Sequence, residues 1–225
     1  MKSLIIIFIS LLVWVGGFAQ KYNNLQEALK TPLKVKELDL SRQDLKEIPK
    51  DIGLFKNLRK LDLSNNELTT LPDAIGQLVK LTDLTVNDNR LNKLPVTLGQ
   101  LPKLKFLLLF NNHFNTFPSE ILSLKKLAYL SLGQNRLKEL PANIAQLTNL
   151  MDLDLKLNQL SSIPQEIGKL KNLWNLNLGY NYLKVIPAQI KSLKELRRLS
   201  LERNALDEAQ KKRLKQWLPD CTIDF

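Results

Sequence analysis

The sequence predicts a repeat fold, in which copies of one short strand-containing unit stack along a single axis. Leucine accounts for nearly a quarter of the 225 residues, about 50 in all, which is well above its usual share. Leucines also recur every 23 residues without an insertion, and a proline and an asparagine recur with the same period. A fixed period of this length is typical of repeat architectures.

The composition is otherwise that of a globular protein, and it excludes several kinds of site. There is one Cys and one His, so neither a disulfide framework nor a Cys-rich or His-rich metal site is expected. Eight glycines argue against phosphate-cradling loops. We therefore expect no cofactor and no metal. The formal net charge of +11 makes an anionic partner worth considering.

Residues 1–19 have the pattern of a secretory signal peptide. An almost unbroken apolar run covers residues 4–15, and the small residues Gly17 and Ala19 stand at the −3 and −1 positions of a cleavage site. The run is shorter than the ~20 residues of a spanning helix, although an uncleaved anchor is the alternative. No cysteine follows it that could carry a lipid. We predict cleavage after Ala19 and a mature chain, without a transmembrane helix, that is secreted, periplasmic or at the cell surface.

Each repeat reads close to LxxLxLxxNxLxxLPxxIGxLxx, and eight copies occupy residues 35–206. They start at residues 35, 58, 81, 104, 127, 150, 173 and 196. These residues resemble the leucine-rich repeat family, and within it the short 23-residue class with the LPxxIGxL second half. The resemblance implies an α/β solenoid bent into an arc, with a parallel β-sheet on the concave face and short 3₁₀ or helical turns on the convex face. It also implies partner binding in general and names no partner.

Each part of the unit has a physical role. In Leu61-Asp62-Leu63 the alternation of a strand directs both leucines inward and the aspartate outward. A strand this short cannot bury its apolar face alone, so copies must stack. The recurrent asparagine can bond backbone groups of the neighbouring turn. The proline ends the inward bend because it fixes φ, and a short 3₁₀ or helical turn should follow, with Ile75 and Leu78 pointing inward.

Both ends need a cap, because a solenoid otherwise exposes apolar surface there. Residues 20–34 are predicted to form an N-terminal helical cap, with Asn23 or Asn24 as its N-cap. Residues 207–225 are predicted to form a C-terminal capping helix and a final strand. Cys221 should be a buried small residue rather than a nucleophile. The inward face of the C-terminal helix is expected to hold Leu206, Ala209, Leu214, Trp217 and Leu218.

Function depends on the outward side chains of the concave face. The fourth repeat directs two phenylalanines and a leucine outward, and a tyrosine follows in the fifth. A soluble protein rarely exposes such an apolar patch without a use, and aromatic residues ringed by polar ones are typical of binding hot spots. We therefore predict that a protein ligand binds here. The predicted partner-binding residues are Phe106, Leu108, Phe110, Tyr129, Asp152, Asp154, Asn175 and Tyr180.

Two alternatives stay open for this patch. The rings could pack on one another and only stiffen the sheet, as cross-strand aromatic pairs do. They could also mediate self-association, which would make the protein a weak homodimer rather than a monomer.

Lysines gather just before the predicted strands and should stack along one edge of the solenoid. An edge of this kind could bind an anionic polysaccharide or a lipid surface, although we favour a solvated, solubilising edge. No aromatic residues interleave with the lysines, so nucleic acid is not expected. No catalytic constellation is present, and we predict a protein that is not an enzyme. The lysines are Lys56, Lys80, Lys103, Lys125, Lys126, Lys171 and Lys194.

Overall fold

The computed structural model of the chain describes residues 21–225. The predicted signal peptide of residues 1–19 and its cleavage site after Ala19 lie outside the described residues. Within residues 21–225, no helix is long and apolar enough to cross a membrane.

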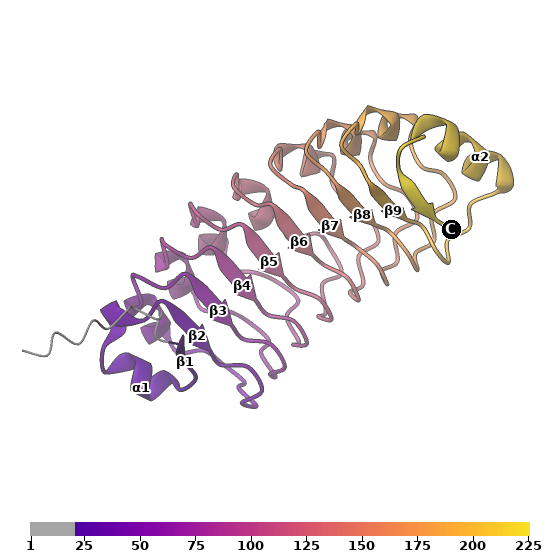
Figure 1. Ribbon diagram of the computed structural model, residues 1–225. Coiled ribbons are helices and arrows are strands. Elements are labelled where there is room, and N and C mark those ends of the chain that lie inside the picture. Colours follow the sequence, from indigo (N-terminus) through magenta and orange to yellow (C-terminus); the bar gives the residue numbers. More distant parts are fainter. Residues whose placement is uncertain (1–20) are drawn as a thin grey trace, which may run out of the picture.

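Short strands lie side by side in one ten-stranded sheet (Figure 1). Neighbouring strands are parallel, and their order in space follows their order in the chain. This confirms the predicted parallel solenoid. The strands are β1 (Lys21–Tyr22), β2 (Glu37–Asp39), β3 (Lys60–Asp62), β4 (Asp83–Thr85), β5 (Phe106–Leu108), β6 (Tyr129–Ser131), β7 (Asp152–Asp154), β8 (Asn175–Asn177), β9 (Arg198–Ser200) and β10 (Thr222–Asp224).

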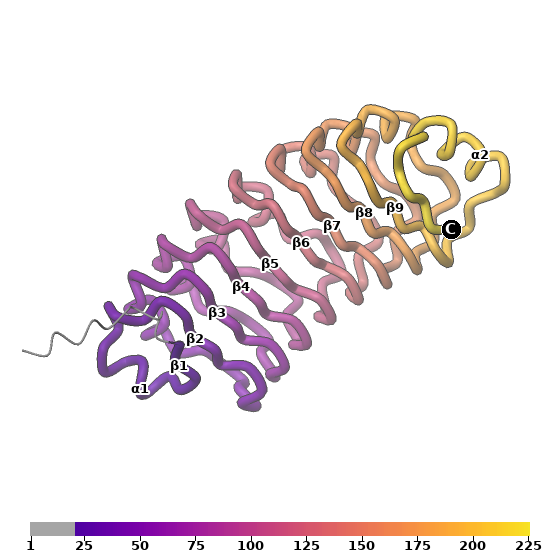
Figure 2. The backbone as a smooth tube through the Cα atoms, viewed as in Figure 1, coloured from indigo at the N-terminus to yellow at the C-terminus, as the bar shows by residue number. Residues whose placement is uncertain are grey.

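The strand register shows that one repeat makes one turn of the solenoid, and the successive turns can be followed along the backbone in Figure 2. Glu37 pairs with Lys60, and Lys60 pairs with Asp83, so each step along the sheet equals one repeat of the sequence. The same step pairs Phe106 with Tyr129. Residues at equal positions in successive repeats therefore form rows that cross the sheet, and these rows determine which side chains meet at a site.

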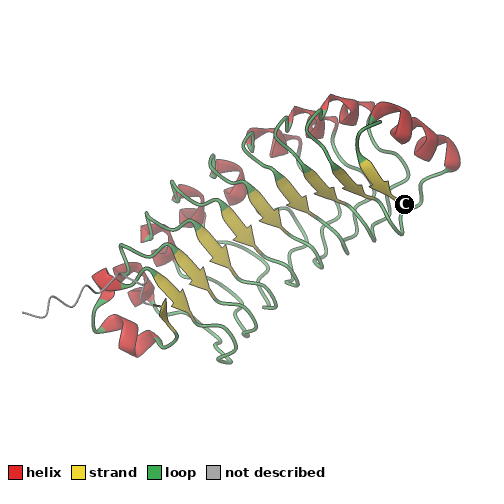
Figure 3. Cartoon of the chain, viewed as in Figure 1, coloured by secondary structure: helices red, strands yellow, loops and turns green. Residues whose placement is uncertain are grey.

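A short 3₁₀ turn lies in each of the first seven repeats on the convex side, away from the strands, and one more precedes the first repeat (Figure 3). From η2 onward, each turn follows a proline whose φ lies between −63° and −73°, because the ring restricts this angle. Ile75 and Leu78 beside the second of these turns are fully buried, as predicted. The turns are η1 (Pro32–Lys34), η2 (Lys50–Leu54), η3 (Asp73–Gln77), η4 (Val96–Gln100), η5 (Ser119–Ser123), η6 (Ala142–Gln146), η7 (Gln165–Lys169) and η8 (Ala188–Ser192).

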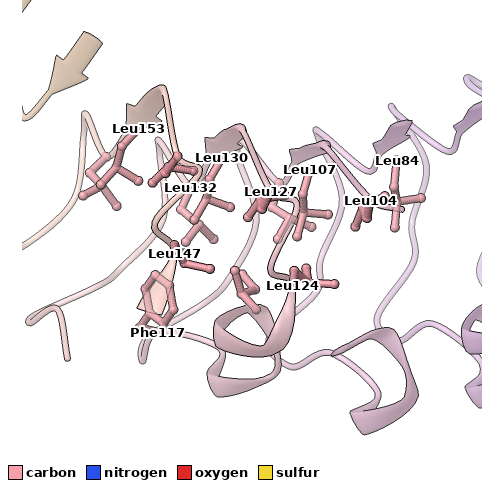
Figure 4. Close-up of a cluster of buried hydrophobic side chains, with 14 of the residues drawn as sticks. Leu84, Leu104, Leu107, Phe117, Leu124, Leu127, Leu130, Leu132, Leu147 and Leu153 are labelled. Atoms are coloured by element: carbon pink, nitrogen blue, oxygen red, sulfur yellow. The ribbon is translucent and has the colours of Figure 1, made fainter. Parts of the chain in front are cut away.

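A continuous core of leucine and isoleucine fills the space between the sheet and the 3₁₀ turns. Leu61 and Leu63 are both buried, so the predicted alternation along the strand is confirmed. In the middle of the stack, Leu107 and Leu130 extend from β5 and β6 into this core, and Leu124 lies across from them near η5 (Figure 4). Full burial of one such side chain contributes about 1.5–3 kcal/mol, so the repeated core is the main source of stability.

A ladder of asparagines holds the bend after each strand. The side-chain amide of Asn135 donates to the carbonyl oxygens of Leu109 and Leu132. Its Oδ1 accepts from the backbone N–H of Phe114 in the preceding repeat. The predicted role of this position is therefore confirmed. The same pattern recurs at Asn66, Asn89, Asn112, Asn158, Asn181 and Asn204.

The N-terminal cap contains a strand as well as the predicted helix. β1 pairs with β2, which the sequence did not indicate. The helix α1 (Leu25–Leu29) begins at the N-cap Asn24, whose side chain accepts from a backbone N–H of the first turn. Ala28 is fully buried against the first repeat. Gln43, which replaces the ladder asparagine in that repeat, donates to the Asn23 carbonyl at 2.8 Å and ties the cap to the solenoid.

The helix α2 (Glu208–Trp217) covers the other end, and β10 adds a last strand beside β9. Leu214 is buried as predicted. The prediction for Ala209 is wrong: its side chain is exposed, and Gln210 takes the buried place. Residues four apart share one face of a helix, so Gln210 follows Leu214 into the interface. Its amide donates to the carbonyl of Ile186 at 3.2 Å, which satisfies the buried polar group.

Cys221, between α2 and β10, should react slowly with thiol reagents. The pKa of its half-buried thiol is raised to about 11, first by burial and then by the charge of Asp224. Because the thiolate is the reacting form, labelling by iodoacetamide at neutral pH should be at least about tenfold slower in the folded protein than in denaturant. Mass spectrometry of timed samples measures both rates, and equal rates would show that the thiol is not protected.

Candidate functional site

The eight predicted partner-binding residues lie on four neighbouring strands and in two of the loops that follow them. Six are on the strands themselves: Phe106 and Leu108 on β5, Tyr129 on β6, Asp152 and Asp154 on β7, and Asn175 on β8. Phe110 lies in the loop after β5, and Tyr180 in the loop after β8.

The rings of Phe106 and Tyr129 stack across β5 and β6. Their centroids are 4.4 Å apart and their planes differ by 10°. Both side chains are only partly exposed. The alternative in which the rings pack on one another accounts for this contact. Both rings nevertheless stay partly accessible at outward positions of their strands.

Phe110 lies over the fifth repeat because that repeat has no side chain beneath the ring. A Cβ added to Gly133 would come within 2.8 Å of the Phe110 Cδ2 and 3.0 Å of the Asp154 Oδ2. The ammonium group of Lys156 lies 5.2 Å from the centre of the same ring, within cation–π range. Gly133 and Lys156 follow Phe110 in one row across the sheet, so three successive repeats build this arrangement together.

Two carboxylates border the rings on β7. Asp152 Oδ2 accepts from the side chain of Asn175 at 2.9 Å, and Asp154 Oδ2 accepts from the Ser131 hydroxyl at 3.1 Å. Burial raises the pKa of Asp152, the hydrogen bond from Asn175 partly offsets this, and the charge of Asp154 raises it further. Among the described residues, Asn175 Oδ1 is buried without a hydrogen-bond donor. The site is therefore rich in hydrogen-bond acceptors.

The two carboxylates of β2 differ from this pair, because each forms an ion pair with a lysine. Asp39 lies 3.0 Å from the ammonium group of Lys21, and Glu37 lies 3.5 Å from that of Lys60. Within residues 21–225, neither aspartate of β7 forms an ion pair. Asp62 on β3 and Asp83 on β4 also form no ion pair among the described residues, so unpaired negative charge on the concave face lies on both sides of the aromatic rings.

Replacing Asp152 with asparagine should raise the melting temperature at pH 7 by about 1–3 °C. The pKa of Asp152 is raised in the folded protein, so its ionisation opposes folding. The new amide removes that charge and brings a donor towards the unpaired oxygen of Asn175. The difference from wild type should shrink as the pH falls through the raised pKa, because protonation then neutralises Asp152 in the wild type as well.

The matched control is Asp39→Asn, for which the sign reverses. Hydrogen bonds from Ser41 and the charge of Lys21 lower the pKa of Asp39 despite its partial burial. Ionised Asp39 therefore stabilises the fold above its unfolded pKa, and the variant should melt lower at pH 7. Thermal unfolding of both variants between acid and neutral pH measures the effect. A lower melting temperature for the Asp152 variant at pH 7 would contradict the raised pKa.

Among the described residues, six of the ten exposed large apolar side chains lie in the sixth and seventh repeats, and sequence reasoning named only one of them, Tyr180. Met151 is 42% and Trp174 55% exposed, and the two lie on adjacent turns because the Trp174 N–H donates to the Met151 carbonyl. Each directly precedes a predicted site residue. The signal was present in the sequence, since this position holds Lys or Arg in the first two repeats. The others are Leu157, Tyr180, Tyr182 and Val185.

The lysine edge is present, and several of its side chains bond the neighbouring repeat. Lys56 Nζ lies 2.8 Å from Gln77 Oε1, and Lys171 Nζ lies 3.1 Å from the Ser192 carbonyl. These contacts to neutral oxygens support a structural and solvating role. Near the N-terminal end, cations line a surface hollow of about 790 Å³. Its lining residues are Lys36, Glu37, Arg59, Lys60, Lys80, Thr82 and Lys103.

Comparison with known proteins identifies both the repeat and related structures. A family model for a leucine-rich repeat region matches residues 92–221, and a second, for the leucine rich repeat, matches residues 34–91. The LRR protein LIC12759 of Leptospira interrogans is 34% identical, with a TM-score of 0.58; the match covers 86% of this chain and 61% of that one. No curated protein matches the chain.

Two receptor structures are also similar. The LRR ectodomain of the membrane receptor kinase GASSHO1/SCHENGEN3 from Arabidopsis thaliana, solved in complex with CASPARIAN STRIP INTEGRITY FACTOR 2, is 34% identical with a TM-score of 0.70, over 83% of this chain and 23% of that one. A TDR receptor is 27% identical with a TM-score of 0.79, over 93% of this chain and 38% of that one. This chain spans less than two thirds of each of these three proteins.

The parallel strands, the 3₁₀ turns and the asparagine ladder all repeat with the same period as the leucines of the sequence. The first family model alone matches more than half of the sequence. The chain belongs to the leucine-rich repeat family.

Proposed function

We propose that the protein is a non-catalytic recognition module that binds a protein partner through its concave face. The observation that carries the proposal is the combination on β5–β7 of a stacked aromatic pair with two carboxylates that have no cationic partner within residues 21–225. We name Phe106, Leu108, Phe110 and Tyr129 the aromatic patch. Rigid aromatic side chains bordered by polar groups are the usual composition of an interface hot spot.

The footprint of the partner should extend from the aromatic patch to Met151 and Trp174. Tryptophan, tyrosine and methionine are enriched in protein interfaces, and Trp174 is more than half exposed. Asp152 follows Met151 in the sequence and Asn175 follows Trp174. These two residues supply hydrogen-bond acceptors of the site on β7 and β8. A partner that places an apolar side chain on the rings and a cationic one against the aspartates would complement this surface.

The comparisons support protein binding as the kind of activity. The Arabidopsis ectodomain that shares 34% identity was solved with a bound factor. We further propose that this chain acts outside the cytoplasm, because residues 1–19 have the pattern of a signal peptide.

The second candidate function is adhesion to an anionic glycan or surface, and the hollow of five cations near the N-terminal end favours it. Such binding would rest on charge and would weaken steeply with salt. The third is self-association through the aromatic patch, which would appear as a dimer in solution.

The test is affinity capture from envelope and host extracts on the immobilised mature chain. A Phe106→Ser/Phe110→Ser variant is the reference, and Val79→Ser/Val96→Ser is the matched control, because both valines are exposed far from the rings on the convex half of their repeats. A protein retained by wild type and control in high salt, and lost by the variant, supports the proposal. Retention that is lost in high salt but is the same for wild type and the double serine variant would instead support binding at the cationic hollow.

A further inference from the structure

The cations on the strands of the concave face all lie in ion pairs, whereas four of the carboxylates do not. Within residues 21–225, the outward positions of the strands, which are their first and third residues, carry three cations and seven carboxylates. Each cation forms an ion pair with one of these carboxylates. The pairs are Lys21–Asp39, Lys60–Glu37 and Arg198–Asp224. The carboxylates that form no ion pair among the described residues are Asp62, Asp83, Asp152 and Asp154.

The strand register places these four carboxylates at the two ends of rows that cross the aromatic patch. Each row has an apolar centre on β5 or on β5 and β6, and one unpaired carboxylate on either side of that centre. Negative charge therefore borders the rings both on β7 and on the side of β3 and β4. The first row is Asp83, Phe106, Tyr129 and Asp152, and the second is Asp62, Thr85, Leu108, Ser131 and Asp154.

Four cations directly precede strands, and they lie at the edge of the sheet rather than in these rows. Lys36 and Arg59 line the cationic hollow. Asp62 and Asp83 line a different hollow, of about 220 Å³, over β2–β4. Both ammonium groups that line this second hollow belong to the ion pairs described above, so the charge of two carboxylates remains there. The four edge cations are Lys36, Arg59, Lys105 and Arg197, and within residues 21–225 none of them forms an ion pair with the four aspartates.

The charge at the other end of the first row is destabilised. Burial raises the pKa of Asp152, and the charge of Asp154 raises it further, while the neutral amide of Asn175 partly offsets both. The nearby ammonium group of Lys156 lies over the ring of Phe110, 5.2 Å from its centre. A cation supplied by a partner would therefore stabilise the ionised form of Asp152.

The length of the first row fits an extended peptide segment that lies across the strands. Neighbouring strands lie ~4.8 Å apart, so Asp83 and Asp152, three strands apart, are separated by about 14 Å. An extended segment advances ~3.3 Å per residue and directs alternate side chains to one face, so residues i and i+4 lie about 13 Å apart with i+2 midway. A helix rises only ~1.5 Å per residue and would need its two contact residues about nine apart.

We propose that the partner of the concave face presents an extended segment with basic residues four apart and an apolar residue midway between them. This inference rests on the proposed function, because it specifies the occupant of the same surface. One basic side chain meets Asp83 beside the hollow over β2–β4, and the other meets Asp152. The apolar side chain packs on the rings of Phe106 and Tyr129. An acidic segment would instead bring like charges together, which is unfavourable at an interface.

The experiment selects a phage-displayed library of random linear peptides on the immobilised protein. Enriched peptides should share lysine or arginine at positions four apart, with an apolar residue midway. A synthetic copy of the most enriched peptide is then measured by calorimetric titration. A second synthetic peptide of the same composition, with its two basic residues made adjacent, should bind about tenfold more weakly. Spermine, a polycation without an apolar side chain, should also bind at least about tenfold more weakly than the enriched peptide.

Two aspartate variants test the ends of the row. Asp83→Asn and Asp152→Asn should each lower the affinity of the enriched peptide about threefold to tenfold, and together about 20-fold or more. Because Asp152→Asn is expected to melt higher than wild type, its loss of affinity cannot come from a loss of folding. The matched control is Asp51→Asn/Asp73→Asn, which removes the same charge from exposed positions of η2 and η3 and should change the affinity less than about twofold.

The outcomes separate this inference from the proposed function. Unchanged affinity in Asp83→Asn/Asp152→Asn, together with a loss in Phe106→Ser/Phe110→Ser, would overturn the inference and leave the proposed function intact. Peptide binding that survives both double variants would overturn both. Enrichment of acidic peptides, of peptides with basic residues about nine apart, or an affinity for spermine equal to that of the peptide would also overturn the inference.

Discussion

Replacing Asn135 with leucine should lower the free energy of unfolding by about 2–4 kcal/mol. The Phe114 N–H, which is buried, donates to Asn135 Oδ1 at 3.0 Å, and leucine would leave it without an acceptor. The carbonyls that accept from Asn135 suffer less, because neighbouring ladder residues also donate to Leu109 and Leu132. The loss of stability thus comes chiefly from the Phe114 N–H, which is left without an acceptor, and from a branched apolar side chain placed among polar backbone groups.

The control for this prediction is the same change at Asn204, the last member of the ladder. Its Oδ1 accepts from the Leu183 N–H at 2.9 Å, but Asn204 is only partly buried, so water can replace the lost bonds. Chemical denaturation of both variants should give a smaller loss for Asn204→Leu. Equal losses would show that the cost is intrinsic to leucine at this backbone position and does not come from unsatisfied buried groups.

The fold could be predicted from the sequence because every part of it is periodic. Strand alternation at Leu61 and Leu63, the proline before each turn and the capping helices all follow from local rules. The structure differs from the prediction at the two ends of the solenoid, where the 23-residue repeat stops. β1 pairs with β2 through backbone groups, and a two-residue strand has no side-chain pattern to reveal it. At α2, a prediction based on apolar residues alone chooses Ala209 as the inward residue, but the rotation of the helix directs Gln210 inward instead.

The functional surface was harder to predict, because it depends on contacts between side chains that lie in one row across neighbouring repeats. The sequence places Phe106 and Tyr129 in one row, but their stacking at 4.4 Å depends on rotamers. Gly133 makes room for Phe110 one repeat away, which only the register shows. The left-handed backbone at Leu157 and Tyr180 is a property of the loop. The asparagines at this position in earlier repeats indicate that conformation, so the two apolar residues could have been recognised as exceptions from the sequence.

The change of Phe106 and Phe110 to serine should lower affinity for the concave-face partner by about 100-fold or more, equivalent to about 3 kcal/mol. Stability should fall less, by about 1–2 kcal/mol, because the stacked pair contributes about 0.5–1.5 kcal/mol beyond its burial and both rings are only partly buried. Calorimetric titration of the captured partner measures the first quantity, and chemical denaturation the second. Binding close to wild type with a large loss of stability would establish that the rings only stiffen the sheet.

Gly133→Ala separates these two roles without removing a ring. Its backbone φ lies outside the left-handed region, so alanine brings no conformational strain, but the new Cβ would come within 2.8 Å of the Phe110 Cδ2 and would displace the ring from its place beside Lys156. A recognition surface depends on that position, whereas an apolar contact that merely stiffens the sheet can re-form with the ring displaced. We therefore expect affinity to fall about tenfold, between wild type and the double serine variant, while stability changes by less than about 1 kcal/mol.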